Sequence, residues 1–149
     1  MNNQTGKKSS KQEEQMRTMS YVLQGDPTPL ARVRVNYNTR RMYDSQQQVK
    51  LIIGITLRQQ HDDKPLLEGP ICLEVTFFMP FPCGMSISKK ASNKGKSHHS
   101  RPDLDNLIKL ILDCSNKICY EDDASIAIIH AKKIYDANPR TEFTLSELK

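Results

Sequence analysis

The sequence predicts a mixed α/β (α+β) domain, because segments with strand periodicity and segments with helix periodicity follow one another along the chain. Residues 71–79, ICLEVTFFM, are rich in β-branched and aromatic side chains and end at a proline-rich turn, as a strand does. Residues 104–118 instead place apolar side chains at i, i+3, i+4 and i+7, which is the spacing of one helix face. The 149 residues suit one domain with one small core.

The residues before 71 are predicted to form a polar tail, two strands and a helix. Residues 1–18 are rich in Lys, Gln, Ser and Asn, so we expect a disordered tail before a domain covering 19–149. Residues 19–23 have the composition of a strand and stop at GDPTPL, which contains two prolines and a glycine. Charged and apolar residues alternate over 32–38, which predicts a half-buried strand. Residues 45–63 show helical spacing, with Ser45 as the expected N-cap.

The segment 84–101 has the most concentrated positive charge in the chain. Its charge of +5 equals the formal net charge of the whole protein, it contains no acidic residue, and its cations are Lys89, Lys90, Lys94, Lys96 and Arg101. It contains glycine and serine but few side chains to bury, so we expect a flexible loop. Such a loop favours an anionic partner such as nucleic acid, although a solvated loop without a partner has the same composition.

The end of the chain and the cysteines complete the organisation. We expect a turn at CYEDD, a strand at 124–137 and a closing segment, TEFTLSEL, with no assigned element. No apolar run approaches the roughly 20 residues of a membrane-spanning helix, and the polar N-terminus does not resemble a secretory signal, so no membrane partner is expected. Cys72, Cys83, Cys114 and Cys119 form no CxxC pair, which predicts reduced thiols in a cytoplasmic protein.

Four aspartates are the candidate catalytic and metal-binding residues. Asp103 and Asp105 are two positions apart, so extended backbone places both side chains on one side. Asp122 and Asp123 precede the strand predicted at 124–137. If that strand pairs beside the chain that leads to Asp103, three carboxylates converge, and oxygen ligands of this kind suit Mg²⁺. A bound ion would polarise a phosphoryl oxygen and lower the pKa of an attacking water.

Each candidate also has an ordinary structural interpretation. Asp103 can cap the helix, and Asp122 and Asp123 can be turn residues. Lys109 can hold a phosphate near the acidic side chains, or it can form an i, i+4 ion pair with Asp105. The adjacency of the basic segment and the acidic cluster favours function, because a phosphodiester is bound by positive charge and is cut with the help of a metal. The residues therefore indicate a metal-dependent nuclease.

The motifs resemble one known family. RPDLDNLIKLILD, followed by YEDDASI and AKKIY, is similar to the RusA-type Holliday junction resolvases, which are endonucleases common in prophages. YVLQGDPTPLARVRV resembles the first strand of that family and its Gly-x-Pro-x-Pro turn with arginines behind it. By position, Asp103, Asp105 and Asp123 match the catalytic, metal-binding carboxylates of the family, Asp122 matches their acidic neighbour, and Lys109 matches the active-site lysine.

The resemblance implies a small mixed β-sheet flanked by helices, assembled as a homodimer. It further implies a Mg²⁺-dependent endodeoxyribonuclease, with Mn²⁺ as a substitute and no small-molecule cofactor, that resolves four-way DNA junctions by paired nicks during recombination and repair. The expected contacts to the DNA backbone come from Lys89, Lys90, Lys94, Lys96, Arg101, Arg32 and Arg34. The chain departs from the family in its polar tail and in lacking an aromatic side chain near the catalytic motif, which puts sequence preference in question.

Two other functions fit the same residues. The first is a non-catalytic module of the same fold that binds branched DNA without cutting it. The second is a structural or inhibitory phage protein whose acidic cluster binds a host partner. Metal-dependent nicking separates the resolvase from both.

Overall fold

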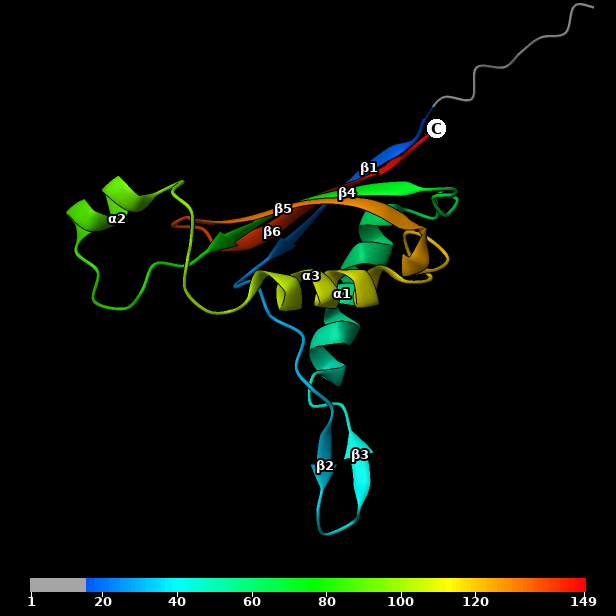
Figure 1. Cartoon of the computed structure of the whole chain (residues 1–149), viewed down its shortest axis with the longest axis horizontal. Coiled ribbons are helices and arrows are strands. Elements are labelled where there is room, and N and C mark those ends of the chain that lie inside the picture. Colours follow the sequence, from blue (N-terminus) through cyan, green and yellow to red (C-terminus); the bar gives the residue numbers. More distant parts are fainter. Residues whose placement is uncertain (1–15) are drawn as a thin grey trace, which may run out of the picture.

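A four-stranded mixed sheet organises the chain in the computed structural model, which describes residues 16–149 (Figure 1). In spatial order the strands are β1 (Thr18–Gln24), β6 (Arg140–Glu147), β4 (Ile71–Met79) and β5 (Ile126–Tyr135). β4 and β5 are parallel, and the other two neighbouring pairs are antiparallel. The expected α+β class with a small mixed sheet is confirmed.

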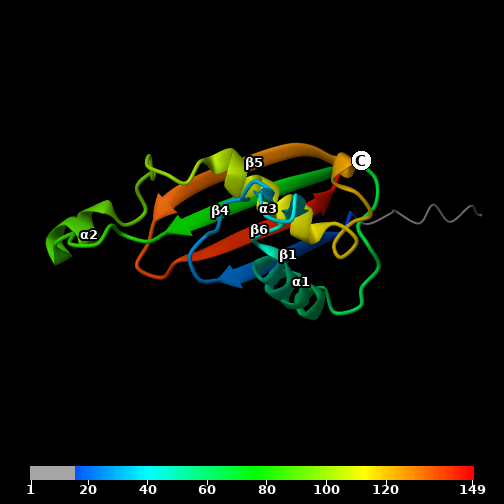
Figure 2. The same ribbon diagram turned by 90° about the horizontal axis from the view of Figure 1, so that it is seen from below.

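Both long helices cover one face of this sheet. α1 (Gln47–His61) and α3 (Leu104–Ser115) lie on the same side in Figure 1, and Figure 2 shows them across the sheet from below. Alternate residues of β4 are buried in the core with Leu57 of α1 and Leu107 of α3, whereas Glu74 is exposed on the other face. This alternation follows from the two-residue period of a strand. Among residues 16–149, no helix has the length and apolar character that crossing a membrane requires.

The two ends of the described chain pair with each other. β6 lies between β1 and β4, although no element was predicted for its residues from the sequence. Its Thr141, Phe143 and Leu145 are buried at alternate positions, as expected for a strand with one face on the core. Arg17 also bonds to Glu147, so the chain is tied to the sheet before β1 begins. Residues 1–15 of the predicted polar tail lie outside the described residues.

Both predicted helices differ at one end from what was expected. Ser45 is not the N-cap of α1: Gln46 occupies that position, without a side-chain cap bond. Asp44 stabilises this start instead, because its carboxylate accepts a hydrogen bond from the Gln46 amide at 2.8 Å and pairs with Lys50 at 2.7 Å. At the other end, α3 stops at Ser115 rather than at residue 118, and Lys117 adopts a φ of 63° that a helix does not allow.

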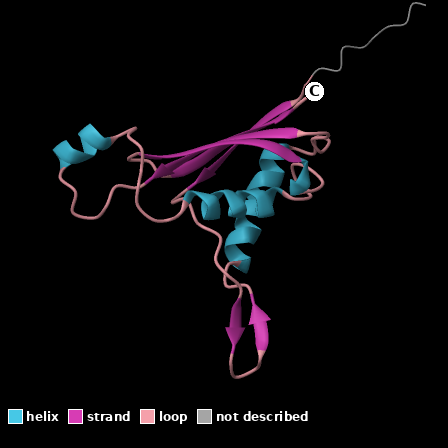
Figure 3. Ribbon diagram, in the orientation of Figure 1, coloured by secondary structure: helices cyan, strands magenta, loops and turns pink. Residues whose placement is uncertain are grey.

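Residues 32–43 were expected to contribute a half-buried strand over 32–38, and this prediction is wrong. β2 (Arg34–Asn36) and β3 (Arg41–Tyr43) pair only with each other, and every one of their residues is exposed. They form a two-stranded ribbon that projects away from the sheet beyond α1 and α3 (Figure 3). We call residues 32–43 the β2–β3 arm.

The basic segment 84–101 contains regular structure that its composition did not predict. α2 (Ile87–Asn93) occupies its middle, and the Ser86 hydroxyl accepts a hydrogen bond from the Lys89 amide at the start of this helix. In Figure 1, α2 lies beyond the end of the sheet, and the chain then returns along β5 to the start of α3.

Candidate active site

The start of α3 presents two exposed carboxylates. Asp103 occupies the N-cap position in extended backbone, with φ −69° and ψ 138°, yet its side chain makes no cap hydrogen bond. Asp105 lies in the first turn, with a side chain that is 65% exposed. Helix capping therefore does not account for Asp103. Both carboxylates remain accessible to a cation or a substrate.

Lys109 forms an ion pair with one member of this acidic pair. Its Nζ lies 3.2 Å from Asp105 Oδ2, one helical turn away. The hydrogen bond from Lys109 holds the pKa of the Asp105 carboxyl below its usual range, so this group stays ionised near neutral pH. The i, i+4 ion pair considered from the sequence thus exists, and it also places a cation beside a candidate catalytic carboxylate.

The loop before Asp103 is fixed by Lys133 of β5. Its Nζ donates hydrogen bonds to the carbonyl oxygens of Ser100 at 2.6 Å and Pro102 at 2.7 Å. Lys133 is not among the candidate residues predicted from the sequence, where it is one of the two lysines of AKKIY. A side chain from β5 therefore determines where the chain enters α3 and where Asp103 stands.

Backbone hydrogen bonds add to this attachment. The Gly95 amide donates to Tyr135 O at 2.8 Å, and the Tyr135 amide donates to Lys96 O at 3.0 Å. The His98 amide donates to Lys133 O at 2.9 Å. Residues 95–102 thus run beside the final residues of β5, so the last part of the basic segment lies next to the acidic pair.

Asp122 and Asp123 lie at the opposite end of α3. The Asp122 carboxylate accepts a hydrogen bond from the Ala124 amide at 2.8 Å and so caps the short helix η1 (Asp123–Ser125) that precedes β5. This contact is the turn role considered for Asp122, whereas Asp123 is exposed. The start of β5, next to η1, is therefore far from Asp103. Lys133, which contacts Pro102 beside Asp103, lies seven positions beyond Ile126, or about 23 Å along the strand. The 12 residues of α3 themselves span about 18 Å.

The conditional prediction that three carboxylates converge does not hold within one chain. In residues 16–149, no three His, Cys, Asp or Glu side chains come together in a group that could hold a metal ion. The connection explains why. β4 and β5 are parallel, so α3 must run back along the sheet between them, and the start of β5 lies at the far end from Asp103. Two separate carboxylate pairs of one chain do not fit a three-carboxylate Mg²⁺ site.

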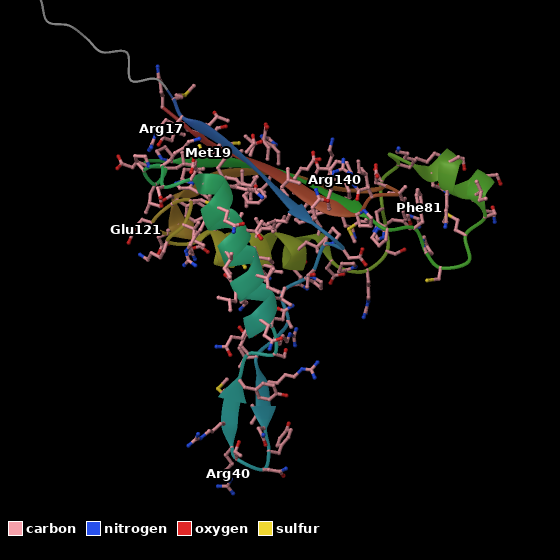
Figure 4. All side chains as sticks on the ribbon, turned by 180° about the vertical axis from the view of Figure 1, so that it is seen from behind. Arg17, Met19, Arg40, Phe81, Glu121 and Arg140 are labelled. Atoms are coloured by element: carbon pink, nitrogen blue, oxygen red, sulfur yellow. The ribbon has the colours of Figure 1, made fainter. Side chains whose placement is uncertain are left out.

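The cations predicted to contact DNA are distributed over three places. Lys89 and Lys90 are on α2, Lys94, Lys96 and Arg101 are in the segment that leads to Asp103, and Arg32 and Arg34 are on the β2–β3 arm. The arm begins close to the acidic pair, because the Leu30 amide donates to the carbonyl oxygen of Asn106 at 2.9 Å. Figure 4 shows Arg40, a further arginine, at the tip of the arm. The start of α3 therefore lies between two basic segments.

Fold and site together define an α+β protein with an exposed acidic pair between two basic segments. The family described as Endodeoxyribonuclease RusA matches residues 24–146, and the chain belongs to this family. The resemblance found in the sequence is thereby confirmed.

Two relatives match over part of their length. The chain is 39% identical over 80 residues to a crossover junction endodeoxyribonuclease rusA of Lactococcus phage r1t, which covers 53% of this chain and 56% of that protein. It is 30% identical over 93 residues to YqaN of Bacillus subtilis (strain 168), which covers 60% of this chain and 66% of that protein. The chain thus spans less than two thirds of the length of either relative.

Proposed function

We propose that this protein is a cytoplasmic, Mg²⁺-dependent, structure-selective endodeoxyribonuclease that resolves four-way DNA junctions in recombination and repair. The observation that carries the proposal is the pair Asp103 and Asp105, exposed and without a capping role, beside the basic segment of a chain in the RusA family. The phage relative, a crossover junction endodeoxyribonuclease by name, favours the junction as substrate and a phage origin.

The proposed active form is a homodimer. The two acidic pairs of one chain lie at opposite ends of α3, so neither end alone offers the three carboxylates that were expected. A two-fold axis that sets α3 antiparallel to its copy would place each start of α3 beside the η1 turn of the other chain. Asp103 and Asp105 would then hold Mg²⁺, or Mn²⁺ in its place, together with Asp123 of the partner subunit and its neighbour, Asp122 of the partner subunit. Two such sites suit paired nicks.

The remaining site residues bind and position the DNA. Lys109 stabilises negative charge that develops on the reacting phosphate, in keeping with its place beside Asp105. Lys89, Lys90, Lys94, Lys96 and Arg101 contact the phosphodiester backbone, as do Arg32 and Arg34 of the arm. Binding should therefore weaken steeply as salt is raised.

The first test measures nicking of a synthetic four-way junction, with linear duplex as the control substrate, in Mg²⁺ and in EDTA. Wild type should make paired nicks that require Mg²⁺. Asp105→Asn should abolish them without loss of junction binding. Asp113→Asn is the matched control, because Asp113 is an exposed aspartate of the same helix outside both acidic pairs. Tight binding by the wild type without nicks in Mg²⁺ or Mn²⁺ would leave a branched-DNA-binding module instead.

The second test asks whether the site is shared between two chains. Asp105→Asn and Asp123→Asn are each expected to be inactive alone. When the two variants are mixed and exchange subunits, a shared site predicts that one of the two sites of each mixed dimer is intact, so single nicks should return. A site within one chain predicts no recovery, because each mixed dimer would then carry one defect in each site.

A further inference from the structure

The β2–β3 arm is unusual in how much positive and apolar surface it exposes. It carries four arginines and no acidic residue in the twelve residues 32–43. Its exposed large apolar side chains are Val33 (54%), Val35 (44%), Tyr37 (89%), Met42 (72%) and Tyr43 (48%). An isolated two-stranded ribbon is only marginally stable, and these exposed apolar side chains do not stabilise it by burial. Clusters of exposed apolar side chains are typical of interaction sites.

The register of the ribbon separates these side chains onto two faces. Arg34 lies opposite Tyr43, and Asn36 lies opposite Arg41. Residues directly opposite each other project to the same side, and successive residues alternate, so these four side chains share one face. Val35 and Met42, which form the intervening pair, point to the other face. We call the side of Arg34, Asn36, Arg41 and Tyr43 the arginine face.

The base of the arm is fixed next to the candidate active site. Leu30 bonds to Asn106, which directly follows Asp105. Gln46 ties the two ends of the arm together, because its side chain accepts from the Ala31 amide at 2.6 Å and donates to Pro29 O at 2.7 Å. The ribbon between these contacts projects freely, and from Arg32 to the tip it reaches about 15 Å. DNA bound at the start of α3 therefore passes the base of the arm.

We propose that the arginine face of the arm lies in the major groove of a duplex arm of the junction, beyond the cleaved phosphate. This inference rests on the proposed function for its substrate. The arm has the charge to bind a polyanion, and a two-stranded β-ribbon has the width that the major groove admits. Arg34 and Arg41, which are diagonal to each other on this face, contact phosphates at the groove edge, and Asn36, directly opposite Arg41, faces the bases. The arm thus provides a second DNA-binding region, separate from segment 84–101.

The test compares two double variants of the full-length protein that lose the same charge. Arg34→Ala/Arg41→Ala alters the arginine face. Lys64→Ala/Lys149→Ala is the control, since both lysines are exposed and line pockets with Arg17, which Figure 4 shows far from Arg40. Junction affinity is measured in EDTA over a range of salt, so that no cleavage intervenes. Each subunit of the proposed homodimer loses two cations, so the slope of log K against log salt should fall by about 4 in the arm variant and stay unchanged in the control.

Hydroxyl-radical footprinting of the bound junction supplies a second readout. Wild type should protect two symmetry-related duplex arms beyond the nick positions, one for each subunit, and the arm variant should lose only that outer protection. All four substituted side chains are exposed, so thermal unfolding of both variants should match wild type.

The possible outcomes separate this inference from the nuclease proposal. If wild type nicks junctions and the two double variants share one slope and one footprint, the arm proposal is wrong and the nuclease stands. If wild type does not nick in Mg²⁺ or Mn²⁺ but the arm variant alone loses slope and outer protection, the arm proposal stands and the nuclease does not. If wild type does not bind the junction, or binds it without salt dependence, the arm does not contact the DNA backbone and the proposal is overturned.

Discussion

The two basic segments, 32–43 and 84–101, have similar charge and opposite attachment. Both are rich in cations and lack acidic residues. The first touches the rest of the protein only at its base, whereas the second is bonded along its final residues to β5 and to Lys133. From sequence, residues 32–38 of the first segment were expected to form a half-buried strand, and the second segment was expected to be flexible. Composition describes the charge of a segment, but contacts with distant residues decide whether the segment is fixed.

Under the proposed function, the difference in attachment corresponds to a difference in role between the two segments. The attached segment leads directly into Asp103, and chemistry at a phosphate needs carboxylates in a precise position. The arm has no such requirement, and a ribbon that can adjust suits a groove whose path varies with the substrate. Four predictions test this contrast, beginning with the largest expected effect.

Substitution of one tyrosine in or beside each segment tests how much that segment contributes to the free energy of unfolding. Tyr135 is 7% exposed, with its ring 4.7 Å from that of His98 and 5.8 Å from that of Phe81, whereas Tyr37 is 89% exposed at the end of the arm. Tyr135→Ala should lower the free energy of unfolding by about 3 kcal/mol, since it removes a buried ring. Tyr37→Ala should change it by less than about 0.5 kcal/mol. Urea unfolding measures both values, and equal losses would contradict the contrast.

Two lysines test whether the attachment positions Asp103. Lys133→Ala removes both hydrogen bonds to the 100–102 loop, so cleavage should fall by about tenfold to a hundredfold while junction binding is retained. Lys133→Arg should recover part of the activity, because a guanidinium also donates two hydrogen bonds. Lys132→Ala, the exposed neighbour, is the control for lost charge. If both alanine variants lose activity equally, charge and not positioning is responsible.

Hydrogen exchange should distinguish the two segments without any substitution. The amides of Gly95, His98 and Tyr135 donate to backbone carbonyls across the contact with β5 and should exchange slowly. The paired amides of the arm belong to an isolated ribbon and should exchange at least about tenfold faster. Bound junction DNA should slow exchange in the arm. If the amides of the arm exchange as slowly as the His98 amide in the free protein, the ribbon is stable by itself and the prediction is wrong.

The smallest effect concerns the pH dependence of the attached segment. Burial, followed by the nearby charges of Lys133 and His99, lowers the pKa of His98 below 6.5. The unfolded chain therefore binds this proton more readily, so the stability supplied by neutral His98 is complete above 6.5 and decreases as the pH falls below it. Urea unfolding between about pH 5 and about pH 8 should show this slope. His98→Asn should reduce it most, and His99→Asn should reduce it less, because burial is the largest cause of the lowered pKa.

The sequence predicted the elements that depend on local periodicity. The apolar run of β4 and the helical spacing of α3 each appear in the structure, because a buried strand and an amphipathic helix impose their periods on neighbouring residues. The motif around Asp103 and Asp105 indicated the RusA family because its residues are contiguous in the sequence, so no knowledge of the fold is needed to find it. β6 was missed because its polar positions alternate with only a few apolar ones, and long-range pairing with β1 and β4 makes it a strand.

By itself, the sequence determined the α+β class, the family and the identity of the acidic and basic side chains, since these depend on residue type and short spacing. Only the tertiary structure decided how those side chains are grouped. The parallel β4–α3–β5 connection separates Asp103 and Asp105 from Asp122 and Asp123, a side chain of β5 fixes the loop before Asp103, and the arm projects uncovered. Each of these outcomes depends on contacts between residues far apart in the chain, which local spacing does not encode.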